Sequence, residues 1–186
     1  MKKLVLRYGL LGGFIVGGIM ATATLYCYGT GRFEGSMVLG YASMLLAFSL
    51  IFVAVKQLRD KHYSGVISFG QAFKTAILIT LVTSTIYVLT WLICYYFFIP
   101  DFMERYSSYM IEKATADGST AAEIAKQNEQ MAMYKDMYKN PLFVVLLTYM
   151  EILPVGLFVS LVAALILKRK GNEAGQESAS LSTSTA

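Results

Sequence analysis

Residues 75–99 read TAILITLVTSTIYVLTWLICYYFFI and contain no charged side chain. A helix needs about 20 predominantly apolar residues to cross the hydrocarbon core of a bilayer. Three other stretches are of similar length and character, at residues 8–27, 36–55 and 142–167, and the only charge within the four is Glu151. The pattern predicts an all-α integral membrane protein with four transmembrane helices, since only helices satisfy every backbone polar group within such segments.

Composition supports this fold class. The 186-residue chain has a mean hydropathy of +0.54 and only 15% charged residues, which is too apolar for a soluble domain of this size. We expect residues 1–170 to form a single transmembrane domain. Residues 171–186 are rich in Ser, Thr, Gly and Glu, and we expect a disordered cytoplasmic tail there.

The basic residues are distributed unevenly between the connecting segments. Ten of the 16 Lys and Arg residues precede the first stretch, separate the second from the third, or directly follow the fourth. The other six lie in residues 28–35 and 100–141, where the longer segment also carries seven acids. Because cytoplasmic loops are enriched in Lys and Arg, both termini are expected in the cytoplasm and these two segments outside. The net charge of +4 is thus explained by the lipid bilayer as partner, with no nucleic acid expected.

Small residues mark helix-packing surfaces in the first two stretches. Gly9, Gly13 and Gly17 recur every four residues and form one stripe along a helix, and Gly40 and Ser43 belong to a similar stripe in the second stretch. Such stripes let membrane helices approach closely. We expect the two helices to pack against each other, with homodimerisation through the glycine stripe as the open alternative.

The segment between the third and fourth stretches predicts an extracytoplasmic helical hairpin over residues 100–141. Its first half has a helical period, and residues 117–119 (Asp-Gly-Ser) indicate a break. Thr120 followed by Glu123 fits a capping box, so a second helix is expected to begin near Ala121.

Glu151 is the most conspicuous candidate for a functional side chain. An acid within a membrane span costs on the order of 3 kcal/mol, and such groups usually face the helix bundle. Pro154, three residues later, removes a backbone hydrogen bond and predicts a kink. Thr83 and Tyr87 lie on a polar face of the third stretch, and with Thr148 they are the candidate partners of the carboxyl group. Two readings stay open: a proton-linked or cation-binding site, and a neutral carboxyl group that only stabilises the bundle.

Other kinds of site are not indicated. The chain has no phosphate-binding loop, zinc-ligand spacing or nucleophile elbow, so we expect no enzyme activity, no metal and no cofactor. Cys27 and Cys94 fall near the outer ends of their predicted helices. They either form a disulfide or serve as small apolar residues in the packing.

Four segments carry a resemblance to a known family. They are residues 67–74 (ISFGQAFK), 95–102 (YYFFIPDF), 137–141 (MYKNP) and 151–157 (EILPVGL). In this order, from about Tyr8 to Lys170, the chain resembles the bacterial membrane proteins catalogued as domain of unknown function 4199. The resemblance implies a small helical protein of the bacterial inner membrane, with no established activity and no catalytic residues.

The expected function is therefore that of a non-enzymatic structural or accessory component of the inner membrane. A homo-oligomer or another membrane protein is the open choice of partner. The alternative is a small transporter or channel that uses Glu151.

Overall fold

The computed structural model describes residues 1–31, 33 and 36–169, and these residues are helical almost throughout. The tail predicted over residues 171–186 lies outside the described residues. The elements in chain order are α1 (Lys2–Thr30), α2 (Ser36–His62), α3 (Phe69–Ile93), the π-helix η1 (Cys94–Phe98), α4 (Phe102–Ala116), α5 (Ala121–Tyr138) and α6 (Pro141–Leu167).

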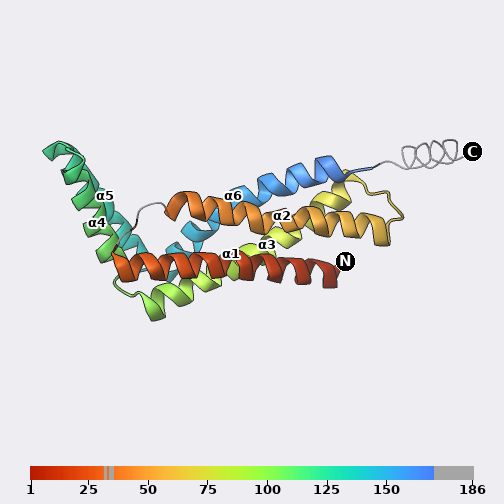
Figure 1. The fold of residues 1–186 in the computed structure, drawn as a ribbon, viewed down its shortest axis with the longest axis horizontal. Helices are drawn as coiled ribbons and strands as arrows, with labels where there is room; N and C mark the ends of the chain where they lie inside the picture. The colour runs from red at the N-terminus through yellow and green to blue at the C-terminus, as the bar shows by residue number, and fades with distance from the viewer. Residues whose placement is uncertain (32, 34–35, 170–186) are drawn as a thin grey trace, which may run out of the picture.

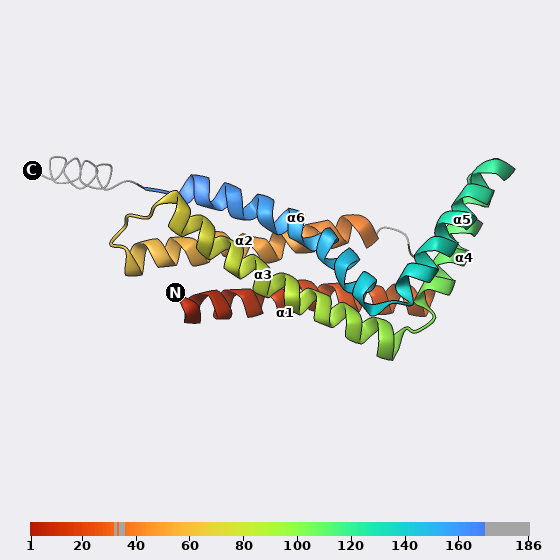
Figure 2. The ribbon, with the colours of Figure 1, turned by 180° about the vertical axis from the view of Figure 1, so that it is seen from behind.

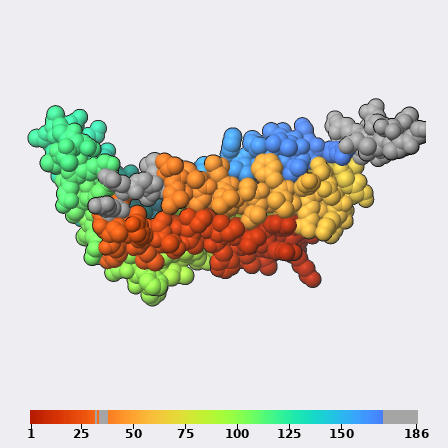
Figure 3. Space-filling view, viewed as in Figure 1, coloured from red at the N-terminus to blue at the C-terminus, as the bar shows by residue number. Residues whose placement is uncertain are grey.

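The four long helices α1, α2, α3 and α6 run alongside one another and form an elongated bundle (Figures 1 and 2). The shorter helices α4 and α5 lie side by side and project at an angle from one end of it. The start of α1, the connection between α2 and α3, and the end of α6 all lie at the opposite end. The space-filling view shows α1 and α2 along one side of the bundle, with α4 projecting beyond them (Figure 3).

The four predicted stretches fall on the four long helices. Each of these helices is long and apolar enough to cross a membrane. The third stretch ends differently from a plain α-helix, because α3 widens into η1, where the Ile99 amide donates to the Cys94 carbonyl at 3.0 Å. The all-helical fold with four long apolar helices is therefore confirmed for the described residues.

Side-chain caps explain where several helices begin. The predicted capping box is present: the Thr120 hydroxyl accepts from the Glu123 amide, and the Glu123 carboxylate accepts from the Thr120 amide at 2.8 Å. α5 begins at Ala121 as predicted. Ser68 and Gln71 form a second capping box at the start of α3. The side chain of Asn140 accepts from the Leu142 amide at 3.0 Å and starts α6.

The first two helices pack against each other as expected, but the glycine stripe of α1 packs against α3 and not against α2. A Cβ atom added at Gly13 would lie 2.6 Å from Cβ of Ile86, and one added at Gly9 would lie 2.6 Å from Cβ of Val82. Gly17 meets Thr90 in the same way, with its Oγ1 2.9 Å from the added atom. The stripe is thus used within the chain, and its partner is the third long helix.

α3 is also held tightly against α6. The hydroxyls of Thr80 and Ser160 are 2.9 Å apart, and Thr80 donates to the Gly156 carbonyl at 3.3 Å. A Cβ atom at Gly156 would lie 2.4 Å from Cγ2 of Thr80 and 2.7 Å from the ring of Phe48 on α2. Three helices therefore meet at this glycine, which anchors the core.

The end of the bundle opposite α4 and α5 carries most of the basic side chains. An isolated antiparallel bridge closes it: the Arg169 amide donates to the Ile67 carbonyl at 2.9 Å, and the Ile67 amide donates back at 3.2 Å. This bridge ties the end of α6 to the connection between α2 and α3. The basic residues placed at this end by their helices are Lys2, Lys3, Arg7, Lys56, Arg59, Lys61, Lys74, Lys168 and Arg169.

Large apolar side chains face outward along the long helices. Phe14 is 68% exposed, Val38 77% and Ile166 65%. Soluble proteins rarely leave so much contiguous apolar surface in water, so this surface indicates a membrane protein.

Candidate functional site

An open pocket of about 570 Å³ lies between the bundle and the α4–α5 pair. All six α-helices contribute to its wall, from Ile19 to Cys27 on α1, from Leu39 to Ser43 on α2, and from Leu147 to Glu151 on α6. Its volume falls within the roughly 300–1,000 Å³ typical of small-molecule sites.

Aromatic side chains dominate the wall, and they follow a simple pattern. Three helices each contribute two rings that are four residues, or about one turn, apart on one face. These pairs are Tyr87 and Trp91 on α3, Phe102 and Tyr106 on α4, and Tyr134 and Tyr138 on α5.

Ring contacts join the helices at this end of the bundle. Trp91 meets Phe102 edge-to-face at 5.3 Å between centroids, which joins α3 to α4. Tyr138 meets Tyr95 of η1 at 5.4 Å, which joins α5 to the end of α3. Because these contacts span the junction between the bundle and the α4–α5 pair, the pocket is built into the fold.

Glu151 lies in this wall, on the inward face of α6. At about 100° per residue, Glu151 is only about 20° around the helix from Val144. Val144 is fully buried, whereas Glu151 is exposed. The carboxyl group is therefore accessible, and Glu151 contributes to the pocket wall.

Two tyrosines flank the carboxyl group of Glu151. Tyr87, itself buried, donates its hydroxyl to Oε1 of Glu151 at 3.4 Å, a long hydrogen bond between α3 and α6. Burial, together with the charge of Glu151, raises the pKa of Tyr138 to about 12. The Tyr138 phenol is therefore neutral at physiological pH.

The other predicted partners of Glu151 have different roles. Thr148 lines the pocket, but its hydroxyl donates to the Val144 carbonyl at 2.7 Å. Thr83 is not part of the pocket wall, and it donates to the Gly9 carbonyl at 3.1 Å, which ties α3 to α1. Of the predicted ligand residues, the structure thus brings together Tyr87, Thr148 and Glu151 and leaves Thr83 outside.

The predicted packing residues of α2 also belong to the pocket. A Cβ atom at Gly40 would meet nothing within 4 Å, so this glycine packs against no neighbouring helix. Ser43 is buried and donates to the Gly40 carbonyl at 2.7 Å. Pro154 lies inside α6, and Figure 2 shows that this helix changes direction in its middle part, as a proline within a helix predicts.

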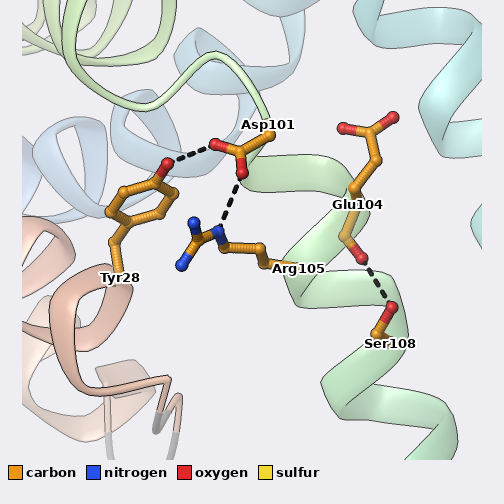
Figure 4. A network of polar contacts seen from close by, with 5 residues as sticks. All are labelled: Tyr28, Asp101, Glu104, Arg105 and Ser108. Carbon is orange, nitrogen blue, oxygen red and sulfur yellow. Dashed lines mark hydrogen bonds and ion pairs between the residues drawn. The ribbon is translucent and has the colours of Figure 1, made fainter.

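A polar network fixes α4 to the end of α1 (Figure 4). The carboxylate of Asp101 lies between Tyr28 and Arg105: Tyr28 donates its hydroxyl to Oδ1, and Arg105 donates to Oδ2 at 2.8 Å. The guanidinium of Arg105 also lies 4.3 Å from the centroid of the Tyr28 ring. The two hydrogen bonds lower the pKa of Asp101. By fixing the start of α4, this network holds Phe102 and Tyr106 over the pocket.

The charge content of the pocket is unusual. Among the described residues, Glu151 is the only acidic side chain in its wall, and no Lys, Arg or His side chain lines it. No group of three His, Cys, Asp or Glu side chains within residues 1–31, 33 and 36–169 is arranged to hold a metal ion. Cys27 and Cys94 are both buried free thiols. The arrangement therefore offers one carboxyl group in an aromatic and apolar chamber.

Sequence reasoning did not predict the pocket, although a signal for it was present. The three aromatic pairs at four-residue spacing lie on segments that are distant in the sequence. Spacing alone places each pair on one face of its helix, but it does not say that the three faces converge.

The fold and this site define an all-helical protein whose four longest helices are apolar enough to cross a membrane, with an open aromatic pocket at one end. The chain belongs to the family described as "Protein of unknown function (DUF4199)", whose model matches residues 11–169. The resemblance stated from the sequence is thereby confirmed. No curated protein and no solved structure matches the chain.

Proposed function

We propose that this protein spans the bacterial inner membrane four times, with both termini in the cytoplasm, and binds a small ligand in the pocket around Glu151 without catalysing a reaction on it. In this proposal it is an accessory component that holds a ligand at the outer side of the bilayer. The α4–α5 pair lies on that side.

The surface of the bundle supports the membrane location. Side chains such as Phe14, Val38 and Ile166 gain nothing from water and are suited to acyl chains. The orientation is supported by the nine described Lys and Arg residues that gather at the end opposite α4 and α5, because basic residues are retained on the cytoplasmic side.

The observation that carries the proposed ligand binding is that the pocket reaches Glu151, the one acid of the fourth long helix. A purely structural carboxyl group is better enclosed by packed neighbours than placed in the wall of an open chamber. Buried polar groups need partners, and within residues 1–31, 33 and 36–169 the one hydrogen bond to the carboxyl group is the long one from Tyr87. The site therefore suits a ligand that completes the interactions of this carboxyl group.

Close packing beyond the pocket favours a binding role over transport. Between the pocket and the basic end, Gly156, Thr80 and Phe48 are packed so closely that an added Cβ atom at Gly156 would lie 2.4 Å from Thr80 and 2.7 Å from Phe48. A channel requires an open path, whereas a binding protein requires only the chamber.

Gly40 gives a direct test of the proposed function. It lines the pocket and an added side chain there meets no neighbour, so Gly40→Phe should fill the chamber without disturbing the bundle. Gly18→Phe is the matched control, because Gly18 also has open space around it but lies outside the pocket wall. Native mass spectrometry of protein purified in mild detergent should show a bound small molecule on the wild type and on Gly18→Phe, and none on Gly40→Phe.

The proposal fails if the same adduct is retained on Gly40→Phe, or if the wild type carries none. The membrane location has its own test, extraction of membranes with alkaline carbonate. The protein should stay in the pellet, and its release into the supernatant would contradict membrane insertion.

A further inference from the structure

We propose that the pocket selects an organic cation with a bulky apolar body, whose charge is neutralised by Glu151 and whose body lies among the aromatic rings. This inference deepens the proposed function and rests on it, since it names the chemical class of the ligand. It is carried by the charge and chemistry of the pocket wall.

The charged side chain of the pocket wall favours a positively charged ligand. In the part of the chain that the structure describes, Glu151 is the only side chain of the wall with a carboxyl group, and no cationic side chain lines the wall to neutralise it. A charge in an apolar chamber is costly unless it is paired. A bound cation supplies that partner for the ionised carboxyl group, whereas an anion would add repulsion.

The aromatic rings of the wall also favour a cation. Tyr87, Trp91, Phe102, Tyr106 and Tyr138 surround the chamber, and the faces of such rings carry negative electrostatic potential. Cations within about 6 Å of a ring centroid are attracted by this potential. This chain already contains one such contact, between Arg105 and the ring of Tyr28 at 4.3 Å.

The pocket wall offers too few oxygen ligands for a bare metal ion. Small inorganic cations such as Ca²⁺ need six or more oxygen ligands at about 2.3–2.6 Å. Here one carboxyl group stands in a chamber of about 570 Å³ whose wall is mostly carbon. The hydroxyl of Thr148 is already directed to the Val144 carbonyl. A cation that carries its own apolar body fits this chamber, and a bare ion does not.

The experiment compares three probes of similar shape and different charge on the full chain in detergent. They are tetraphenylphosphonium (cation), tetraphenylborate (anion) and triphenylphosphine oxide (neutral), and binding is measured by equilibrium dialysis. Tetraphenylphosphonium should bind at least tenfold more tightly than either of the other two. This comparison uses the wild type alone, so it does not depend on the folding of a variant.

Variants then connect the selectivity to the carboxyl group. Glu151→Gln should lower the affinity for tetraphenylphosphonium at least tenfold, whereas Glu151→Asp, which keeps the charge, should lose much less. Glu104→Gln is the matched control, because Glu104 is an exposed acid of α4 that lies outside the pocket wall. Its affinity should equal that of the wild type.

Each other result overturns the inference. If the neutral or anionic probe binds as tightly as the cation, or if Glu151→Gln binds the cation like the wild type, the pocket does not select for positive charge. In those cases the proposed ligand binding still stands. If no probe binds, the cation proposal is wrong, and the Gly40→Phe experiment decides separately whether the pocket holds a ligand at all.

Discussion

The two halves of the bundle use the same helices in opposite ways. Towards the basic end, small residues such as Ala72, Ala76, Ala163 and Ala164 are completely buried, and the helices touch. Towards α4 and α5, paired aromatic rings hold α3, α4 and α5 around an open chamber. Side-chain size along a helix therefore decides whether a membrane-type bundle is closed or hollow at a given depth.

The comparison also explains why Glu151 is tolerated. It lies five residues before Gly156, where the packing is tightest, and on the hollow side of that contact. An acid placed within the closed half would have no space for a partner.

The strongest test enlarges the glycine at the closed centre. Gly156→Val should destabilise the bundle by about 3 kcal/mol, because its Cβ atom alone would lie 2.4 Å from Thr80 and 2.7 Å from Phe48. Gly40→Val, in the hollow half, is the control and should leave stability nearly unchanged. Unfolding in micelles, followed by circular dichroism, measures both. Equal losses in the two variants would contradict the contrast between the halves.

A second pair of variants tests the contact of α1 with α3. Gly13→Ala should cost about 2 kcal/mol, because the added Cβ atom would lie 2.6 Å from the branched Cβ of Ile86. Gly18→Ala should instead gain up to about 1 kcal/mol from helix propensity, since nothing lies near it. The same unfolding measurement applies. A Gly13→Ala protein that is as stable as Gly18→Ala would show that the glycine stripe does not pack within the chain.

A smaller effect is expected from the hydrogen bond between Tyr87 and Glu151. Tyr87→Phe removes the hydroxyl that donates to Glu151 at 3.4 Å and keeps the ring. Hydrogen bonds between membrane helices contribute about 0.6 kcal/mol on average, so the loss in stability should be of that order. A loss several times larger, found by the same unfolding assay, would mean that Tyr87 and Glu151 are a main structural tie and would favour the structural reading of Glu151.

The smallest effect is expected at the network that fixes α4. Tyr28 and Arg105 donate to the Asp101 carboxylate and lower its pKa, so the network contributes fully above the ordinary pKa of about 3.9 and is lost as the pH falls through the lowered value. Hydrogen exchange of the first turn of α4 should therefore be the same at pH 8 and pH 5 after correction for the intrinsic rate. Tyr28→Phe should speed exchange there without affecting the bundle. Faster corrected exchange at pH 5 in the wild type would contradict this sign.

The sequence predicts what depends on local pattern. The four long helices follow from uninterrupted apolar runs, and the start of α5 follows from the Thr120–Glu123 capping box. Each of these features needs only residues within a few turns of one another. The family resemblance follows from short segments for the same reason.

What the sequence did not predict depends on contacts between distant segments. The stripe of Gly9, Gly13 and Gly17 predicts a close neighbour, but α2 and α3 both offer small or hydroxyl-bearing faces. Periodicity does not choose between them, and α3 is the neighbour. Thr83 and Tyr87 likewise lie on one polar face of α3, but they have different neighbours. Thr83 contacts α1, whereas Tyr87, one turn later, lines the pocket.

The pocket needed still more distant information. Its wall combines all six α-helices, and the placement of α4 and α5 depends on ring contacts across the junction. Glu151 was identified as a candidate because an acid in an apolar run is unusual in any arrangement. Its surroundings followed only from the fold.

The π-helical turn at Cys94–Phe98 has a consequence for the length of this part of the chain. A turn closed by a bond from residue i to i+5 holds one residue more than an α-helical turn, so every side chain after it is rotated by about 100° relative to a regular helix. Tyr95 faces inward there, while Phe97 and Phe98 face outward. Deleting one residue from this turn should redirect Asp101 and Phe102 together. A relative that is one residue shorter between Trp91 and Asp101 is thus expected to place the α4 side of its pocket wall differently, even where every other position aligns.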